Sequence, residues 1–466
     1  MLVALISTVL FSIGCSCLLP SPTPYGPRVT GDGTGGAIAV YEVRKGLNQR
    51  AFYAQRVSSE GDALWGKKGV LVGSGYKNWD SFFDLHIIND DSGGAIIAWS
   101  AYPSRQQQIP LAHYVTKVNS EGSILWQKEV RAVDHMISDG AGGAIIATDY
   151  SYDEETLFIL KIDAEGNFPW GPEGVYVRRE GYCDHSLGVS GDGNDGAIFI
   201  WQELHTEPGP EPHWPKTTNR IFAQRINSNG SLSWGQDGVI LYTTPQGVYS
   251  EEPKVISDGL GGGIALWMQV PEGIIEEGSP EALLSDIYAQ RVDAQGNVLW
   301  AGNGVPLGIT QGEGVCPSNA LVVSDGAGGA IIIWEDLRKG LMSMYAQKID
   351  ADGSIKLQPG GEEVCYIKTN SSFWPRMAVS DGSGGAIVTY SNRAQRIDAG
   401  GRTMWRGDGI KFADGDTHDL AYDGQGGAIT AWGIGKSTFS LEKSYVQRVS
   451  AEGKLLWGEK GIRLNP

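Results

Sequence analysis

The sequence predicts an all-β protein, an eight-bladed β-propeller built from four-stranded antiparallel blades. A glycine-rich tight turn that begins with aspartate recurs eight times, and each copy joins two short apolar strands. A second pair of strands follows each copy. Four short strands cannot bury both faces of a sheet alone, so a repeat of this length predicts sheets stacked in a ring. The eight turns begin at Asp32, Asp90, Asp139, Asp192, Asp258, Asp325, Asp381 and Asp423.

The clearest repeat spans residues 253–307. Its first strand, Lys254–Ser257, leads into the turn Asp258–Gly262, whose glycines tolerate positive φ. The second strand is Gly263–Trp267 and the third is Asp286–Asp293. The fourth is Asn297–Leu307.

The same order of elements defines the other blades. The blades are expected at about 28–73, 82–130, 133–178, 186–242, 253–307, 319–367, 376–412 and 418–464, within one domain over 28–466. The first blade begins with its own first strand and the last ends with its own fourth strand. The ring is therefore expected to close without an exchanged strand.

Three kinds of residue recur once per blade, which assigns them to structure rather than to a single site. Tryptophan at strand 4 and an aromatic residue at the end of strand 2 are expected to fill the wedge between neighbouring sheets. A lysine or arginine late in strand 3 is expected to pair with a turn aspartate or a strand-end carbonyl. The strand 4 tryptophans are Trp65, Trp126, Trp170, Trp234, Trp300, Trp405 and Trp457.

The segments IDAEGNFPWG and VDAQGNVLWA resemble the Asp-x-x-(Thr)-Gly-x-x-x-Trp repeat of the quinoprotein-like (PQQ-like repeat) propellers. The Gly166-to-Trp170 and Gly296-to-Trp300 intervals match that repeat, whereas its threonine is missing. The resemblance implies eight blades. It implies no quinone site, because no adjacent Cys-Cys pair beside a carboxylate-lined pocket is found.

Residues 1–14 resemble an export signal. Leu2–Ile13 is apolar but too short to span a bilayer, and Gly14-Cys15 resembles the cleavage site of a bacterial lipoprotein. We expect Cys15 to carry lipid and residues 15–27, rich in proline, to form a short tether. The protein is then exported and anchored to the cell envelope or surface; plain secretion is the alternative.

Charge and cysteine content limit the partners. The formal net charge is −17, which opposes binding to nucleic acid and to anionic lipid, so a membrane is expected only through the lipid anchor.

Export permits disulfides. Cys316 and Cys365 flank blade 6 and could pair; free, buried thiols are the alternative.

Function is expected on the face that carries the loops between strands 2 and 3 and between blades, because all the length variation lies there. The longest loops are Ser100–His113, Gln202–Asn219 and Met268–Ser285. Three tryptophans outside the repeat fall on this loop face, where they suit sugar stacking or protein contact. Local packing of their own loops is the alternative role. They are Trp79, Trp214 and Trp374.

Histidines lie at or near the first strand of four blades, each close to an aspartate, and would ring the mouth of the channel. Together with carboxylates, they could bind a divalent metal, although a solvated polar channel is the simpler explanation. The channel-mouth candidates are His86, His135 and His185, and the densest metal candidate is the set Asp414, Asp416, His418 and Asp419.

Nucleophile elbows, phosphate loops, HExxH and paired CxxC motifs are not found in the sequence. We therefore expect a non-catalytic binding or scaffold module for a protein or glycan partner, with no cofactor beyond an optional divalent cation. The alternative is an extracytoplasmic carbohydrate-active hydrolase or lyase with its site at the channel mouth. Two carboxylates about 5–10 Å apart would favour that alternative.

Overall fold

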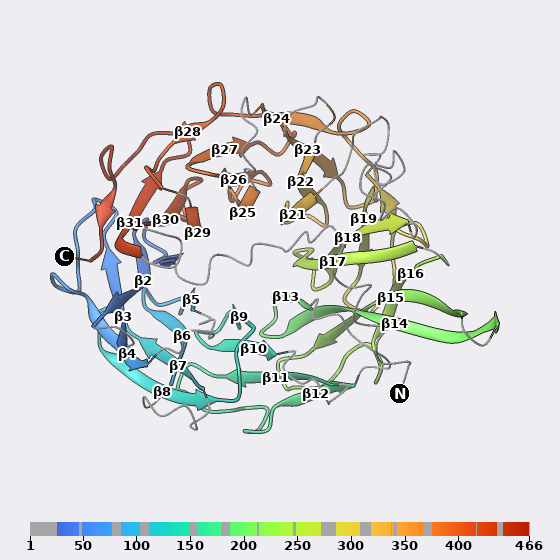
Figure 1. Ribbon diagram of the computed structural model, residues 1–466, viewed down its shortest axis with the longest axis horizontal. Coiled ribbons are helices and arrows are strands. Elements are labelled where there is room, and N and C mark those ends of the chain that lie inside the picture. The colour runs from blue at the N-terminus through green and yellow to red at the C-terminus, as the bar shows by residue number, and fades with distance from the viewer. Residues whose placement is uncertain are drawn as a thin grey trace.

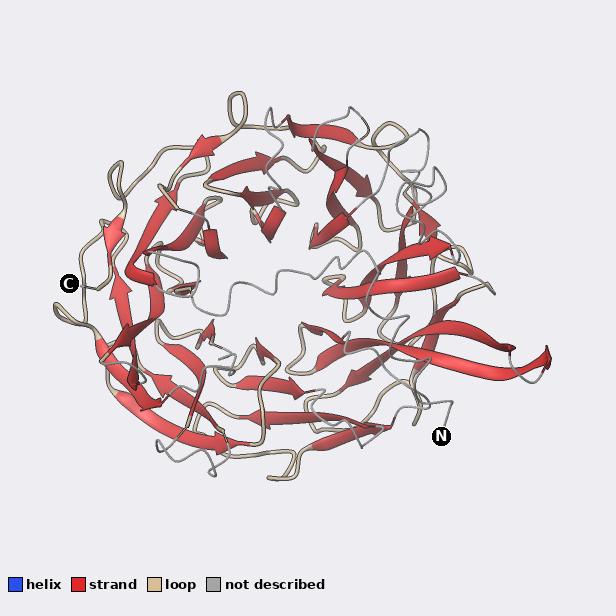
Figure 2. Ribbon diagram, viewed as in Figure 1, coloured by secondary structure: helices blue, strands red, loops and turns tan. Residues whose placement is uncertain are grey.

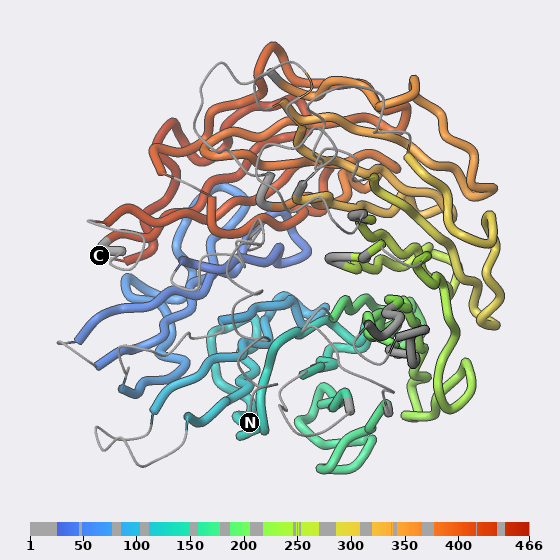
Figure 3. Tube along the Cα trace, turned by 45° about the vertical axis from the view of Figure 1, so that its right-hand side comes forward, coloured from blue at the N-terminus to red at the C-terminus, as the bar shows by residue number. Residues whose placement is uncertain are grey.

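The computed structural model contains eight separate four-stranded antiparallel sheets, each built from four consecutive strands. The predicted eight-bladed propeller is confirmed. The blades follow one another around a ring in chain order, and the first lies beside the last (Figure 1; Figure 3). The structure describes residues 26–45, 49–76, 85–102, 111–148, 156–178, 187–211, 214–245, 248–271, 286–307, 318–336, 338, 343–366, 375–415, 417–435 and 441–465.

The innermost strand of each blade contacts the innermost strands of both neighbours, which closes the ring. The innermost strands are β1 (Arg28–Gly31), β5 (His86–Asn89), β9 (His135–Ser138), β13 (Leu187–Gly191), β17 (Val248–Ser257), β21 (Ser318–Ser324), β25 (Pro375–Ser380) and β29 (Thr417–Tyr422). The second strands are β2 (Ala37–Arg44), β6 (Ala95–Ala101), β10 (Ala144–Thr148), β14 (Ala197–Glu211), β18 (Gly263–Pro271), β22 (Ala330–Asp336), β26 (Ala386–Tyr390) and β30 (Ala428–Gly435).

The third and outermost strands complete each sheet, and every regular element in these ranges is a strand. None of the described residues forms a helix long and apolar enough to cross a membrane. The third strands are β3 (Gln49–Val57), β7 (Ala112–Val118), β11 (Thr156–Ile162), β15 (Trp214–Ile226), β19 (Asp286–Val292), β23 (Ser343–Ile349), β27 (Arg393–Ile397) and β31 (Leu441–Val449). The outermost strands are β4 (Val70–Tyr76), β8 (Ile124–Val130), β12 (Val175–Arg178), β16 (Val239–Thr243), β20 (Val305–Pro306), β24 (Glu362–Tyr366), β28 (Ile410–Lys411) and β32 (Ile462–Arg463).

The turn between strands 1 and 2 is held by its aspartate. Oδ1 of Asp258 accepts hydrogen bonds from the backbone N–H groups of Leu260 and Gly262, both at 2.8 Å. A Cβ atom at Gly262 would lie 2.2 Å from the carbonyl oxygen of Val292, so the close approach of strand 3 requires glycine there. This geometry explains why the pattern Asp-x-x-Gly/Asp-Gly marks each blade.

Two polar contacts recur near the short turns, one within a blade and one between blades. Within each of the eight blades, the predicted ion pair between the strand 3 base and the turn aspartate is present at 2.8–3.8 Å. The tryptophan indole N–H donates to a carbonyl in the next blade's 3–4 turn at 2.8–3.2 Å, for Trp65, Trp126, Trp170, Trp234, Trp300, Trp405 and Trp457. These contacts occupy the face of the short turns, which we call the turn face.

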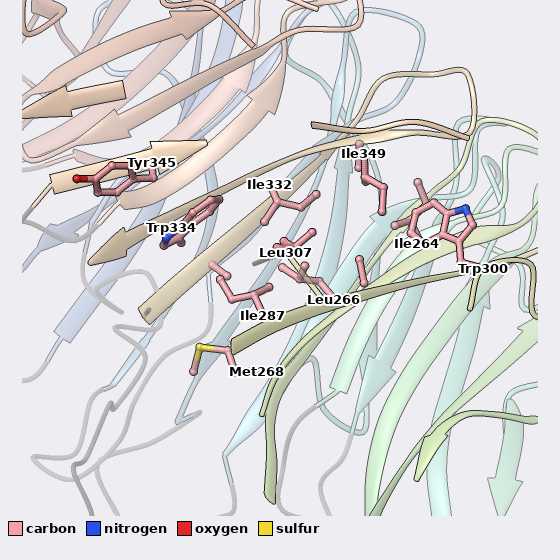
Figure 4. Close-up of a cluster of buried hydrophobic side chains, with 13 residues drawn as sticks. Ile264, Leu266, Met268, Ile287, Trp300, Leu307, Ile332, Trp334, Tyr345 and Ile349 are labelled. Atoms are coloured by element: carbon pink, nitrogen blue, oxygen red, sulfur yellow. The ribbon is translucent and has the colours of Figure 1, made fainter. Parts of the chain in front are cut away.

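Aromatic and branched side chains fill the wedge between blades, as predicted. Between blades 5 and 6, Trp300 packs at one end of a buried cluster and Trp334 at the other, with Leu266 and Ile332 between them (Figure 4). Trp334 is fully buried. The once-per-blade aromatics therefore serve packing.

The ring closes without strand exchange. Strands β1–β4 form one sheet and β29–β32 another, so no sheet mixes the two ends of the chain. At this seam Trp457 Nε1 donates to Ser59 O at 3.1 Å, and Val29 N donates to Asp419 Oδ2 at 2.7 Å. Side chains and their hydrogen bonds, rather than a shared ladder, hold blades 8 and 1 together.

The predicted extent of strand 4 was wrong in most blades. Trp300 precedes the regular strand β20, and a single bridge between Val292 and Val298 is the pairing in the Trp-bearing stretch. Gly304, with φ of 77°, lies between the Trp-bearing stretch and β20. It breaks the pairing with strand 3, since a residue in the left-handed conformation cannot continue a strand. Only β8 carries its tryptophan, Trp126, within the strand.

A buried glutamine supports the stretch before the outermost strand in six blades, five with the tryptophan and blade 6 with Leu357, and sequence analysis missed it. Gln290 Oε1 accepts from Arg291 N at 2.9 Å and Trp300 N at 3.0 Å, and Nε2 donates to Ala301 O at 2.8 Å. The six are Gln55, Gln224, Gln290, Gln347, Gln395 and Gln447.

Gln290→Leu is expected to lower the free energy of unfolding by about 2 kcal/mol, because it leaves buried backbone groups without partners. Chemical denaturation measures the change. Blade 3 carries Leu160 at the same position, one residue before its strand 3 base, so leucine fits the space. Leu160→Ala provides a control for packing alone, and an unchanged midpoint for Gln290→Leu would contradict the role of the amide.

Candidate functional site

Blade 4 carries a hairpin arm that projects beyond the disc (Figure 2). Strands β14 and β15 stay paired from Ala197↔Ile226 out to Glu207↔Lys216 and Glu211↔Trp214. The outer strand β16 pairs with β15 only as far as Arg220. The arm, residues 204–219, is therefore a two-stranded ribbon, and the prediction of a loop over Gln202–Asn219 was wrong.

The base of the arm rests on blade 5. Asn219 Nδ2 donates to Ser250 O at 3.3 Å, and Ser250 Oγ donates to Gln202 Oε1 at 3.0 Å. Asn219 N donates to Thr244 Oγ1 at 2.8 Å. The Asn219 bond to Ser250 joins the arm to β17 of the next blade, and the bond to Thr244 joins it to the residue after β16 of its own blade.

The three loop-face tryptophans stay predictions. Trp79 and Trp374 lie outside the described residues. Trp214 begins β15, so its backbone belongs to the arm, whereas its side chain is not described. Of the three, only Trp214 is thus placed on an element that projects from the disc.

The channel wall can be compared between blades by counting back from each turn aspartate. The residue four positions earlier stands in the same register in every innermost strand, opposite the middle of strand 2. We call this set the wall layer: Arg28, His86, His135, Gly188, Lys254, Leu321, Met377 and Asp419. It holds two of the predicted channel-mouth histidines, whereas His185 lies outside the described residues. Sequence analysis missed Arg28 and Lys254, although the same counting finds them.

Arg28 links three blades. Its Nε donates to Leu85 O at 3.1 Å in blade 2, and its Nη1 donates to His418 O at 2.8 Å in blade 8. Lys254 makes the corresponding bond in blade 5, from Nζ to Ala320 O at 2.6 Å. The cations of the wall layer are therefore held against the backbone of the next blade.

Two wall-layer residues near Arg28, His86 and Asp419, have pKa values shifted from their ordinary ranges. Burial, with the positive charges of Arg28 and His135, lowers the pKa of His86 to about 3. Burial raises the pKa of Asp419, while Arg28 and backbone N–H groups oppose that rise. His86 Nε2 has no hydrogen-bond partner in the described part of the chain.

The predicted metal set is not gathered at one point. Asp414 is exposed and pairs with Lys411 at 3.2 Å, and Asp416 lies outside the described residues. His418 is buried against Gly26, where a Cβ atom would lie 2.1 Å from its ring, and Asp419 accepts from Val29 N. Among the described residues no group of three potential ligands is suited to a metal ion. The metal site stays a prediction.

A carboxyl group that the sequence did not reveal lies between blades 6 and 7. Glu335 on β22 is 1% exposed, and neither of its oxygens has a hydrogen-bond partner among the described residues. Burial raises its pKa to about 9, and the nearby Asn319 offsets only part of that rise. Glu335 is therefore protonated at neutral pH.

Cys365 on β24 is a buried free thiol, and Cys316, its suggested partner, lies outside the described residues. Burial raises the pKa of its thiol to about 12. A thiol of this kind is a poor nucleophile because little thiolate forms.

The fold defines the protein as an eight-bladed β-propeller, and comparisons with known proteins assign it to no narrower family. No family model matches the chain, and no curated protein matches it. Among solved structures it is similar to an ulvan lyase of polysaccharide lyase family PL25, with 11% identity, 78% of this chain and 92% of that chain covered, and a TM-score of 0.47.

Two other solved structures share the same general architecture. The β-propeller domain of the Trilobed protease from Pyrococcus furiosus is 13% identical, with 80% of this chain and 92% of that chain covered and a TM-score of 0.39. The Hadza microbial sialidase Hz136 is 9% identical, with 87% and 72% covered and a TM-score of 0.33. At these values the similarity concerns the propeller fold and not an activity.

Proposed function

We propose that the protein is a non-catalytic binding or scaffold module that engages a protein or glycan partner through its loop face. The observation that carries the proposal is the arm of blade 4, a ribbon built on rigid strands that projects from the ring. Rigid scaffolds with protruding, variable connections are a common basis for recognition. Export and a lipid anchor at Cys15 are part of the same proposal.

The ring does not need the arm for its own assembly. In blade 7, β26 passes to β27 through two residues, Ser391 and Asn392, and the blade still forms all four strands. The recurring tryptophan hydrogen bonds between neighbouring blades lie at the turn face instead. An element that packing does not require is a candidate for contact with a partner.

The alternative, a carbohydrate-active enzyme, would need a protonated carboxyl group within reach of substrate. Glu335 has the required protonation state but is 1% exposed between two blades. Its burial favours a structural effect over general acid catalysis. The binding proposal is therefore preferred.

Shortening the arm, by replacing residues 206–217 with Asn-Gly, is expected to weaken partner binding at least about tenfold and to leave the melting temperature within about 2 °C. Partners are identified by a glycan array and by crosslinking to envelope proteins, and the affinity of each is then measured for both forms. The physical reason is that the replaced residues lie beyond Asn219, whose side chain holds the base of the arm against blade 5.

A matched control changes the opposite side of the disc. Leu64 is 49% exposed beside the turn-face tryptophan of blade 1, and Leu64→Ala removes apolar surface there. This variant should bind as the unaltered protein does. Equal affinity of the arm-shortened form, or turnover of a glycan by the pure protein, would overturn the proposal.

A further inference from the structure

We propose that the channel mouth binds a small oxyanion, a carboxylate or phosphate group, on the arc of the wall layer formed by Arg28, His86 and His135. These residues stand on β1, β5 and β9, the innermost strands of three consecutive blades, which contact one another in that order. Lys254 occupies the same register in blade 5, on a strand that is not adjacent to these three. The arc of Arg28, His86 and His135 thus brings together groups that favour an anion.

The site is accessible as well as interior. Of the three residues of the arc, Arg28 is buried, whereas His86 and His135 are half-buried although each belongs to an innermost strand. Some surface of these two residues therefore remains open to solvent. An anion of a few atoms placed there would meet residues of adjacent blades.

Arg28 is held in place for this role. Its two hydrogen bonds, to Leu85 O at 3.1 Å and to His418 O at 2.8 Å, join blades on both sides. The carboxylate of the neighbouring Asp419 is likewise engaged by the backbone, at Val29 N and at Leu420 N. A fixed cation loses little conformational entropy when an anion binds, and such preorganisation favours affinity.

His86 has an unused nitrogen at the centre of the arc. The ring makes one hydrogen bond to the backbone of Val133, and Nε2, within the buried part of the ring, has no partner in the described ranges. With the Val133 bond made by Nδ1, a proton taken up at Nε2 would create a donor for an anion. Burial and then the positive charges of Arg28 and His135 oppose that proton, and a bound anion would offset the two charges.

The same cations disfavour a divalent metal at this point. Arg28 lies beside Asp419, the one wall-layer carboxylate, and its charge repels a second cation. The overall charge of −17 opposes anion binding at long range, but screening limits that effect to about 8–10 Å at physiological salt. The local arrangement decides what the channel mouth holds.

The test follows the ring resonances of His86 by NMR in the full chain, during titration with inorganic phosphate and, separately, with glucuronate. Binding should shift the His86 resonances and raise the pKa of His86, and His86→Gln should weaken the affinity at least about tenfold. Binding of both anions indicates a general oxyanion site; binding of glucuronate alone indicates a site for a sugar carboxylate. Either result supports the proposal.

His113 offers a matched control. It lies on β7, bonds to Ser100 Oγ through Nδ1 at 2.7 Å, and is not part of the wall layer. His113→Gln should leave the affinity and the His86 shifts unchanged. Absence of any His86 response to either anion at about 50 mM, a concentration that saturates even a millimolar site, would overturn the proposal. So would unchanged affinity in a folded His86→Gln protein.

Discussion

Trp457→Ala is expected to lower the free energy of unfolding by about 3–5 kcal/mol, the usual cost of removing a buried tryptophan. Trp457 is 4% exposed in the cluster that joins blades 8 and 1, and its indole N–H bonds to Ser59 O. No strand crosses this seam, so the substitution removes packing and a hydrogen bond on which closure of the ring depends. Chemical denaturation followed by tryptophan fluorescence measures the loss of stability.

Trp234→Ala is the matched control, because Trp234 makes the same hydrogen bond between blades 4 and 5. Those blades are consecutive in the chain, whereas blades 8 and 1 are at opposite ends of it. The two variants should lose similar stability, but only the seam variant should become more sensitive to limited proteolysis in blades 1 and 8. A loss below about 1 kcal/mol for Trp457→Ala would contradict the role assigned to the seam.

The architecture could be predicted because local chemistry repeats with it. The turn aspartate needs backbone N–H groups two and four residues later, and glycine where strand 3 approaches closely, so each blade carries the same short pattern. Asp258 and Gly262 show both requirements. The pairing of aspartate with the strand 3 base could be anticipated on charge alone, and Arg291 confirms it at 2.8 Å.

The arm could not be predicted because its sequence is typical of a loop. Pro208, Pro210, Pro212 and Pro215 remove backbone donors, which excludes a central strand. A ribbon with no neighbouring strand on either side does not need all of those donors. Strand pairing can therefore continue through a stretch that its composition assigns to a loop.

The candidate site was predicted only in part. His86 and His135 were found because histidine is a residue type often used in metal and proton-transfer sites. Arg28 and Lys254 belong to the same layer by register and not by type, and counting from the turn aspartate would have found them. Glu335 had no such signal, because it follows Trp334 in a strand whose complete burial depends on two neighbouring blades.

Glu335→Gln is expected to stabilise the protein at alkaline pH. The pKa of Glu335 is raised to about 9 from 4.5, so between these values the folded chain keeps a proton that the unfolded chain releases. Stability then falls as pH rises through this window, by at most about 1.4 kcal/mol per unit. Glutamine resembles the protonated acid and carries no charge to desolvate. At pH 8 the variant should be more stable by about 3–5 kcal/mol.

Urea denaturation at pH 5, 6.5 and 8 separates this effect from a general change in packing. The advantage of Glu335→Gln over the unaltered protein should be small at pH 5 and should grow with each step. Glu362→Gln is the control, because Glu362 is exposed on β24 of the same blade and its charge stays in water. An advantage that is the same at all three pH values would mean that Glu335 is ionised in the folded state. Blade 6 would then contain a charged, hydrated carboxylate, and this result would favour the alternative that the protein is an enzyme.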